Sequence, residues 1–274
     1  MPENNLPRAD SALCARGLAP SRERAQGLIA AGLAYSNGEV IKKAAQKIAP
    51  DASLEVRGEY CPYVSRGGFK LAHALDAFSV SPEGLVCIDV GASTGGFTDV
   101  LLQCGAAHVY AVDVGSGQLA STIAADARVT SMENVNAREL TRGMFPSPPA
   151  LGVMDVSFIS IVKILPALRD VLGHGRLVSL VKPQFEAGPD APRKKGVISS
   201  AAVHERVLRD LAALAPQCGW RVRAYAASPI AGTQGNIEFL ADFIPDDGRT
   251  PLPERDAIRA LVRRAHAQLR HQGC

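Results

Sequence analysis

The stretch LVCIDVGASTGGFTDVLL, residues 85–102, carries the features that decide the fold of this chain. Its first part, 85–90, is a nearly continuous apolar run, which is typical of a strand buried on both faces. A glycine-rich loop follows at 91–96, and the apolar residues 100–102 indicate a helix after it. Small residues between a strand and a helix N-terminus let a ligand approach the backbone closely. The stretch therefore predicts the first β–α unit of a ligand-binding α/β sheet.

Strands and helices alternate along the chain after this first unit. The next strand ends in an acid, Asp113, and the last two strands are expected to form an antiparallel pair. Such alternation predicts an α/β fold with an open, doubly wound and mostly parallel sheet of seven strands, which is a Rossmann-like architecture. The further strands are expected at 108–113, 127–131, 150–155, 176–181, 220–226 and 236–243, with helices at about 161–172 and 200–217.

The glycine loop favours one cofactor class over another. Its spacing, Gly91-x-x-x-Gly95-Gly96, differs from the G-x-G-x-x-G of dinucleotide-binding dehydrogenases, which remain the alternative. A negative charge at Asp89 is unfavourable beside a pyrophosphate but suits the cationic groups of S-adenosylmethionine. Asp113 can accept both hydroxyls of a ribose. The predicted cofactor-binding residues are Asp89, Gly91, Ala92, Ser93, Gly95, Gly96, Phe97, Asp113 and, for the adenine, Asn134 and Asn136.

Four charged residues lie in segments that contain glycine or proline near the ends of predicted strands. Asp155 ends the fourth predicted strand and Lys182 the fifth, so both belong to the carboxyl edge of the sheet, where ligands bind in such folds. Glu238 is expected to begin the last strand, and Lys70 lies in the segment before the first. Each alone is typical of a surface charge. The four together indicate a reactive site.

The N-terminal residues 1–58 form a different kind of unit, joined by a linker at 59–65 to the domain at 66–248. Two short helices, an Asn37-Gly38 hairpin and a strand at 54–56 are expected, with Ser21 as the cap of the second helix. This small α+β unit resembles an S4-type RNA-binding domain. The resemblance implies RNA contacts by Arg8, Arg16, Ser21, Arg22, Arg24, Lys42 and Lys43, with Arg66 after the linker; a solvated surface is the alternative.

Charge is distributed unevenly along the chain. The 30 Lys and Arg exceed the 27 Asp and Glu by only three, but both ends are basic and the middle is slightly acidic. The C-terminal residues 249–274 include a predicted amphipathic helix at 253–272. Its apolar face is narrow and lacks aromatic side chains, which favours covering the sheet and presenting arginines to RNA over binding a membrane. That face contains Ile258, Leu261, Val262, Ala265 and Leu269, and the arginines are Arg255, Arg259, Arg263 and Arg270.

Several protein classes are excluded by what the sequence lacks. It has no uncharged apolar run of about 18 residues, as a transmembrane helix requires, and the polar residues 1–10 do not form a signal peptide. The six cysteines are scattered, without the spacing of a metal site, and are expected to be reduced thiols of a cytoplasmic protein.

Five motifs, taken in order, resemble the TlyA family, rRNA 2′-O-methyltransferases of the FtsJ-like group once called haemolysins. These are SRGGFKL, DVGASTGGFTDVLL, DVSFIS, LVKPQFE and GNIEF. The resemblance implies a Lys-Asp-Lys-Glu tetrad at Lys70, Asp155, Lys182 and Glu238. It also implies S-adenosylmethionine as cofactor and the 2′-hydroxyl of cytidine in 23S and also 16S rRNA as acceptor.

A ribose hydroxyl is a weak nucleophile, so a base must take its proton. Lys182 is the candidate, provided that desolvation or the neighbouring Lys70 disfavours its charged form. We expect a monomer that acts on rRNA within ribosomal subunits, without a metal and without stable membrane association. A membrane-active haemolysin, a methyltransferase for another RNA and a base or protein methyltransferase remain alternatives.

Overall fold

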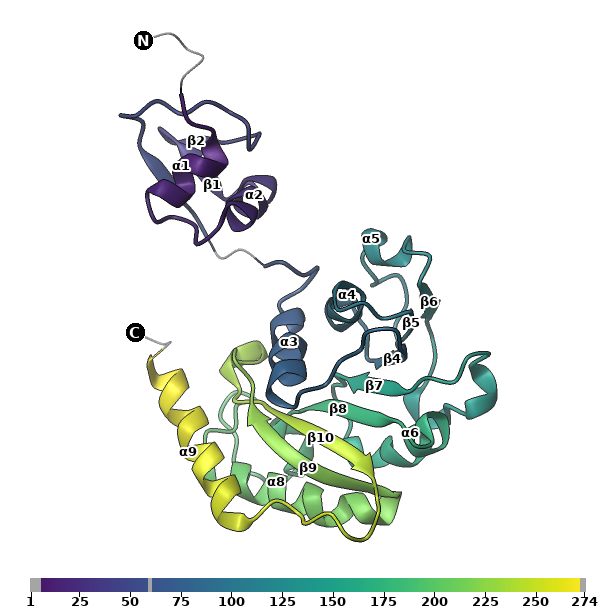
Figure 1. Cartoon of the computed structure of the whole chain (residues 1–274). Helices are drawn as coiled ribbons and strands as arrows, with labels where there is room; N and C mark the ends of the chain where they lie inside the picture. The colour runs from purple at the N-terminus through teal and green to yellow at the C-terminus, as the bar shows by residue number, and fades with distance from the viewer. Residues whose placement is uncertain (1–5, 59–60, 272–274) are drawn as a thin grey trace. The chain divides into compact units, whose positions relative to one another are not determined.

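The chain divides between Pro62 and Tyr63 into two units, each with its own apolar core. The computed structural model describes residues 6–58 and 61–271, apart from the side chains of 233 and 269–271. Figure 1 shows the elements of both units, which are described here one at a time.

The N-terminal unit is built from two helices and a three-stranded antiparallel sheet (Figure 1). Ser21 caps the second helix, as expected, by accepting a hydrogen bond from the Arg24 amide. Asn37 and Gly38 both have positive φ, +49° and +83°, which a two-residue hairpin turn requires. The elements are α1 (Ala9–Ala15), α2 (Arg22–Ala30), β1 (Ala34–Ser36), β2 (Glu39–Val40) and β3 (Leu54–Val56).

A buried carboxylate ties the two helices of this unit together. Asp10 is fully buried in α1. It accepts a bidentate pair of hydrogen bonds from Arg8, at 3.0 and 2.9 Å. Arg22 and Gln26 of α2 donate to its Oδ2 at 3.2 and 2.9 Å. These donors hold the pKa of Asp10 far below its usual range, with the Arg8 hydrogen bonds the largest cause.

The second unit is organised by a seven-stranded sheet in the order β6-β5-β4-β7-β8-β10-β9. The first five strands of the unit are parallel, and β10 runs antiparallel to both β8 and β9, which confirms the predicted architecture. The strands are β4 (Val86–Val90), β5 (His108–Val112), β6 (Val129–Met132), β7 (Leu151–Met154), β8 (Arg176–Val181), β9 (Trp220–Ala227) and β10 (Phe239–Pro245).

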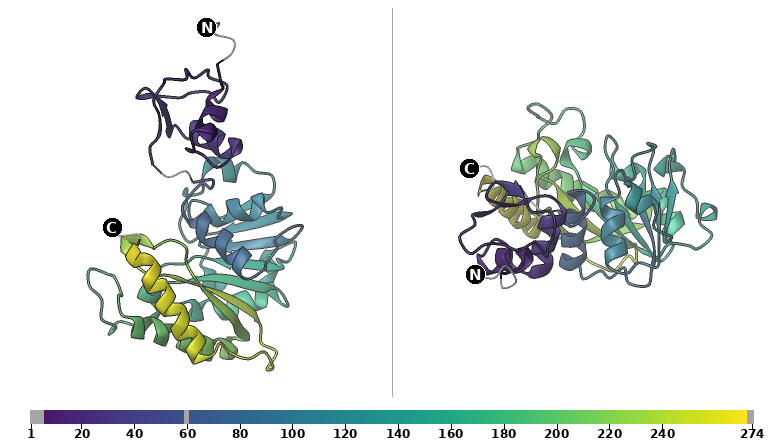
Figure 2. Two further views of the ribbon diagram at one scale, coloured as in Figure 1. Left: turned by 60° about the vertical axis from the view of Figure 1, so that its left-hand side comes forward. Right: turned by 90° about the horizontal axis from the view of Figure 1, so that it is seen from above.

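Helices cover both faces of this sheet (Figures 1 and 2). Side chains of α3, α4 and α5 pack with one face, and those of α6, α8 and α9 with the other. The strands therefore bury both faces, as the apolar run at 85–90 predicts. The α-helices are α3 (Gly67–Ala77), α4 (Gly96–Gln103), α5 (Ser121–Ala124), α6 (Leu165–Leu172), α7 (Pro183–Glu186), α8 (Ala201–Leu214) and α9 (Arg255–His271). Short 3-10 turns are η2 (Ala137–Glu139), η3 (Arg142–Met144), η4 (Ile161–Lys163), η5 (Ala215–Cys218) and η6 (Thr233–Gly235).

Some element bounds differ from the prediction, and the causes are local. The last strand begins at Phe239 rather than at Asn236, because the Asn236 side chain is bonded to the 196–198 segment. The two predicted helices are shorter, with 3-10 turns next to Pro166 and Pro216, which lack an amide donor. Helix α3 was not predicted, because its first two residues are glycines.

The C-terminal helix α9 uses its apolar face within its own unit. Ile258, Leu261, Val262 and Ala265 are buried, and the helix packs against α8 and β9. The prediction that this face covers the fold is confirmed; the side chains of Leu269 and Arg270 lie outside the described residues. Within 6–58 and 61–271, the helices are all too short or too polar to cross a membrane.

Asp10→Asn should destabilise the N-terminal unit by about 1–3 kcal/mol, because the substitution leaves the two half-exposed guanidinium groups without their carboxylate. Since folding lowers the pKa of Asp10, its contribution is present above about pH 4 and declines as the pH falls below that value. Hydrogen exchange of peptides from residues 6–58, compared at pH 6, measures the change. Fluorescence of Trp220, the single tryptophan, should show the second unit unaffected.

Candidate active site

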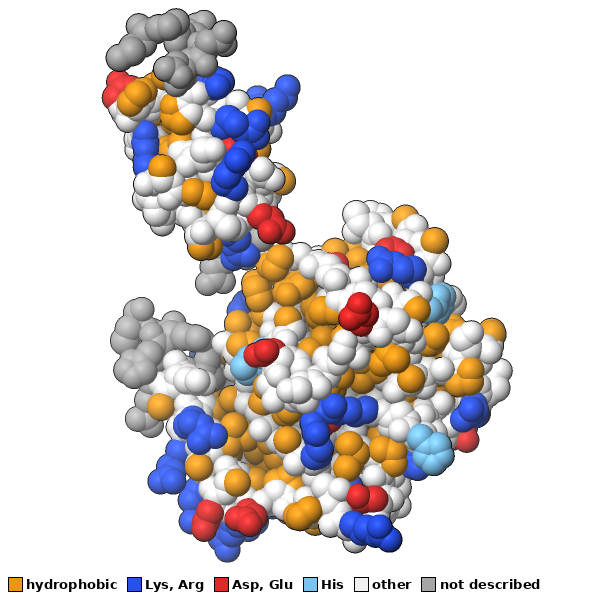
Figure 3. All heavy atoms as spheres, viewed as in Figure 1, with side chains coloured by type: hydrophobic (Ala, Val, Ile, Leu, Met, Phe, Trp, Pro, Cys, Tyr) orange, Lys and Arg blue, Asp and Glu red, His pale blue; other side chains and the backbone are white. Residues whose placement is uncertain are grey.

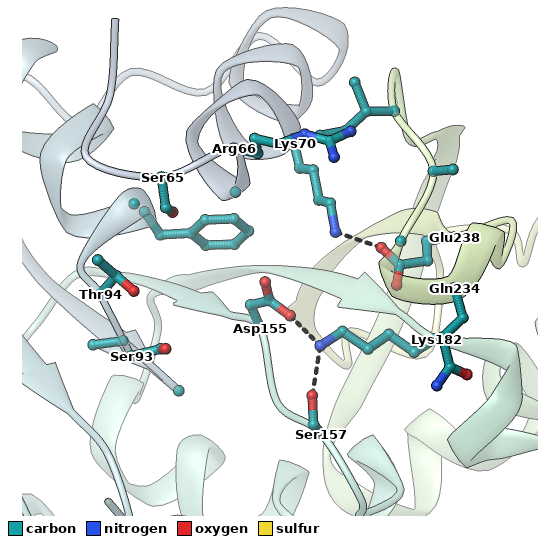
Figure 4. Close-up of a pocket in the computed structure, with 18 of the residues that line it drawn as sticks. Ser65, Arg66, Lys70, Ser93, Thr94, Asp155, Ser157, Lys182, Gln234 and Glu238 are labelled. Atoms are coloured by element: carbon teal, nitrogen blue, oxygen red, sulfur yellow. Dashed lines mark hydrogen bonds and ion pairs between the residues drawn. The ribbon is translucent and has the colours of Figure 1, made fainter. Parts of the chain in front are cut away.

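The predicted tetrad lines one cavity of the second unit (Figure 4). In the sheet, β4 lies between β5 and β7, so the chain order reverses at β4 and opens a crevice at the carboxyl ends of these strands. The cavity there has a volume of about 730 Å³. Lys70, Asp155, Lys182 and Glu238 all contribute to its wall. The described residues contain no cluster of His, Cys, Asp and Glu able to hold a metal ion.

Asp155 and Lys182 form the first ion pair of the cavity. They directly follow β7 and β8, which are adjacent parallel strands, so both side chains emerge at the same sheet edge. Lys182 Nζ lies 2.6 Å from Asp155 Oδ1 and donates a hydrogen bond to Ser157 Oγ at 2.8 Å. Figure 4 shows Lys182 pointing toward both groups. The ammonium group is therefore held in one place at the carboxyl edge.

Lys70 and Glu238 form the second pair, which joins α3 to the segment just before β10. Lys70 Nζ lies 2.5 Å from Glu238 Oε2, and the side chains are only 11% and 2% exposed. The loop before Glu238 wraps around its carboxylate so closely that a Cβ at Gly232 would overlap the carboxylate oxygens. A larger residue at that position would displace the Glu238 carboxylate from its place beside Lys70. Glu238 precedes β10 rather than beginning it, which corrects the expected strand start.

The glycine loop forms the opposite wall of the same cavity. Gly91 has φ +84°, and a Cβ there would lie 2.5 Å from the carbonyl oxygen of Asp155. A side chain at Gly91 would therefore push β4 away from the end of β7. Of the predicted loop residues, Gly91, Ala92, Ser93, Gly96 and Phe97 line the cavity. Gly95 does not; it caps α4 at φ +95°.

Asp113 borders a second cavity, of about 470 Å³, which shares Gly91, Ser93, Asp155 and Ser157 with the first. Its carboxylate accepts hydrogen bonds from the Ser93 amide at 2.8 Å and the Gly115 amide at 2.7 Å. A carboxylate has about four acceptor positions, so two remain for a ligand. The two cavities thus offer a continuous site along the ends of β5, β4 and β7.

Asp89 and Asn134 are not where the sequence analysis expected them. Asp89 is fully buried beneath the glycine loop and lines neither cavity. Its Oδ2 accepts a hydrogen bond from Thr98 at 2.7 Å, whereas Oδ1 has no partner among the described residues. Burial raises the pKa of Asp89 to about 7. Asn134 is exposed outside both cavities.

Asn136 does border the second cavity, but its side chain has local partners. Its oxygen accepts from the Arg138 amide and its nitrogen donates to Glu139. We therefore assign it to shaping the wall of the cavity.

Sequence reasoning missed residues whose roles are to support others. Ser157 orients Lys182, Thr98 bonds Asp89, and Gly232 makes room for Glu238. The motif DVSFIS contained a signal for Ser157, which lies two residues after Asp155. No pattern in the sequence distinguishes Gly232 from other loop glycines.

The predicted RNA-binding residues fall into two groups. Arg8 and Arg22 hold Asp10, Arg16 donates to the carbonyls of Ala49, Pro50 and Ala52, and Ser21 caps α2, so all four have structural partners. Lys42 and Lys43 are exposed, and Arg24 is half-buried. Figure 3 shows several Lys and Arg side chains at the surface of this unit.

Arg66 belongs to the second unit. It precedes α3 and lines the tetrad cavity, so it is placed with the reactive site rather than with the basic N-terminal unit.

Family models match both units. Residues 8–53 match the S4 domain, and residues 63–243 match the FtsJ-like methyltransferase. The second match covers well over half of the chain and includes all four residues of the tetrad.

Relatives match nearly the whole chain. The Mycobacterium tuberculosis 16S/23S rRNA (cytidine-2′-O)-methyltransferase TlyA is 42% identical, over 85% of this chain and 88% of its own. Hemolysin A of Brachyspira hyodysenteriae is 42% identical over 86% of this chain and 99% of its own. A solved structure from Streptococcus thermophilus, described as a hemolysin, is 43% identical with a TM-score of 0.75 and covers 97% of this chain and 98% of that one.

Asp89→Asn should make the stability of the second unit less dependent on pH. The pKa of Asp89 is about 7 in the folded chain against about 3.9 when unfolded. Its neutral form is therefore favoured by folding, and the free energy of unfolding declines as the pH rises from about 4 to 7. Denaturant titration followed by Trp220 fluorescence at pH 5 and 7.5 measures this change. Asp76 is exposed, so Asp76→Asn is the matched control. If the free energy of unfolding of Asp89→Asn declined between pH 5 and 7.5 as steeply as that of the wild type, the raised pKa of Asp89 would be contradicted.

Proposed function

Because the chain belongs to the FtsJ-like methyltransferases, and within them to the TlyA family, we propose that it methylates the 2′-hydroxyl of a cytidine in ribosomal RNA. The observation that carries this proposal is the pair of Lys–carboxylate contacts that face one cavity beside the glycine loop. The 23S rRNA and also the 16S rRNA are the proposed acceptors, recognised within ribosomal subunits. Nothing in the described residues favours a membrane-active role, since the apolar face of α9 is covered.

S-adenosylmethionine supplies an electrophilic methyl group attached to a sulfonium. The chain offers a site that fits it. Gly91, Ala92 and Ser93 line the tetrad cavity, and Asp113 has acceptor positions left for ribose hydroxyls. Asp155 borders both cavities and places a carboxylate where a cationic group would be favoured. It takes over the electrostatic role that the sequence analysis gave to the buried Asp89.

The tetrad then acts on the acceptor. The 2′-oxygen bonds to the methyl carbon as the carbon–sulfur bond breaks, and its proton must pass to a base. We assign that base to Lys182 Nζ, which Asp155 and Ser157 hold in place. Lys70, fixed by Glu238, supplies a second cation that positions the ribose and its phosphate. Lys182 can accept this proton only in its neutral amine form.

The S4 unit provides the means of docking on RNA. Lys42 and Lys43 extend into solvent and are the proposed phosphate contacts, together with Arg24. Arg66 lies in the cavity wall, where it can reach the acceptor strand. We propose that the chain acts as a monomer in the cytoplasm, without stable membrane association.

Lys182→Ala should reduce methyl transfer by about 10²–10⁴-fold while cofactor affinity stays within a few-fold, because the base is lost but the glycine loop is intact. The measurement uses labelled S-adenosylmethionine with isolated 30S and 50S subunits, and locates the product as a 2′-O-methyl by resistance of the adjacent linkage to alkali. Lys182→Arg should be equally inactive. Lys163→Ala removes an exposed lysine that lines neither cavity and is the control. Full activity of Lys182→Ala would eliminate the proposed base.

Salt should separate the two binding steps. If phosphate contacts dominate RNA docking, the affinity for ribosomal subunits falls by orders of magnitude between about 50 and 200 mM salt. The affinity for the cofactor, whose contacts are local, should change little. Both are measured on the full chain, by filter binding and by calorimetry. An RNA affinity that does not depend on salt would contradict the proposed phosphate contacts.

A further inference from the structure

A tight hairpin of the second unit presents two lysines beside the tetrad cavity. Lys194 and Val197 exchange backbone hydrogen bonds, each at 3.0 Å. Lys195 and Gly196 form the turn between them, both with positive φ, +50° and +80°. A lysine at such a φ carries backbone strain that glycine would avoid. The turn therefore keeps a lysine at a position where the backbone would favour another residue.

The hairpin is fastened to the segment that carries Glu238. Asn236, which is 3% exposed, donates from Nδ2 to the Gly196 carbonyl at 3.3 Å. Its Oδ1 accepts from the Ile198 amide at 3.1 Å. Asn236 thus holds both the base of the hairpin and, two residues later, the start of the segment that pairs with Lys70. The backbone of the hairpin is therefore tied to the segment that carries Glu238.

A surface depression connects the hairpin to the site. Lys194, Lys195, Val197 and Ser199 line it together with Gln234, and Gln234 also lines the tetrad cavity. Figure 4 shows Gln234 among the residues that line the tetrad cavity. A strand with one nucleotide in the tetrad cavity can therefore continue along this depression.

The charge of the hairpin is not used within the fold. Lys194 and Lys195 are exposed and form no ion pair with any described residue. Arg193 differs, because it donates to the carbonyls of Gly188 and Ala191 and so braces the loop. The loop contains one carboxylate, Asp190, against three cations. Two adjacent ammonium groups held out to solvent match the charge of a nucleic-acid backbone.

We propose that the Lys194–Lys195 hairpin binds phosphates of the acceptor RNA strand that flank the nucleotide in the tetrad cavity. This proposal rests on the proposed function, since it takes RNA as the substrate. The hairpin would fix the register of the strand, whereas the S4 unit would supply docking to the ribosomal subunit. Phosphate contacts position a nucleic acid without reading its sequence.

The test is the double variant Lys194→Gln/Lys195→Gln, assayed on isolated ribosomal subunits with labelled S-adenosylmethionine over a range of KCl. We expect the KM for subunits to rise roughly 5–20-fold while kcat and cofactor affinity stay within two-fold. The slope of log kcat/KM against log salt should become shallower by about one to two. Lys194→Arg/Lys195→Arg should restore the wild-type values. Lys163→Gln/Arg209→Gln, which removes two exposed charges elsewhere in the unit, should match wild type.

An unchanged KM and salt slope in the double variant would overturn the proposal. A loss that the arginine variant does not restore would overturn it as well, because it would mark the hairpin as structural. Measuring the affinity of the wild type and the double variant for subunits without cofactor tests the hairpin separately from the proposed methyl transfer. If the wild type binds but methylates neither subunit, the proposed function fails, while a weaker, less salt-dependent affinity of the double variant still supports the hairpin as an RNA contact.

Discussion

The buried ion pair between Lys70 and Glu238 is the contact on which the reactive site depends. It joins residues 168 positions apart in the sequence. The pair brings α3, at the start of the second unit, against the segment just before β10. Burying two charges costs desolvation that the contact only offsets, so such a pair adds little net stability. The pair instead fixes where the two side chains lie. Gly232 and Asn236 shape the loop around Glu238, and Asn236 also bonds to the backbone of the Lys194–Lys195 hairpin.

The other half of the site follows from the sheet. Asp155 and Lys182 meet because each follows a parallel strand and the two strands are neighbours. Gly91 lets the end of β4 approach the Asp155 carbonyl, so the glycine loop and the tetrad share one cavity. Methyl donor and acceptor can then be aligned by backbone positions that the core already holds. In the proposed mechanism the fold supplies proximity, and the four charged side chains supply proton transfer and orientation.

In the basic N-terminal unit, several positively charged side chains stabilise the fold of the unit itself. Its arginines at positions 8, 16 and 22 are occupied with Asp10 and with backbone carbonyls, and they hold a small domain together that has little core. Lys42 and Lys43 are exposed instead, whereas Lys47 donates to the Leu6 carbonyl. A similar contrast is present in the hairpin, where Arg193 braces the loop and Lys194 and Lys195 are exposed.

The sequence by itself determined the sheet, the cofactor class and the places of two of the four tetrad residues. Apolar runs mark buried strands, and residues after adjacent parallel strands must share an edge, so Asp113, Asp155 and Lys182 could be placed without a structure. Helix α3 and the pairing of Lys70 with Glu238 could not, because glycines hide the start of α3 and no local pattern reports a contact across 168 residues. Only the tertiary structure showed that Asp89 is beneath the loop, that Arg8 and Arg22 serve Asp10, and that Gly232 and Asn236 support the site. Local sequence governs which faces are buried, whereas the partners of a polar side chain depend on what the fold brings beside it.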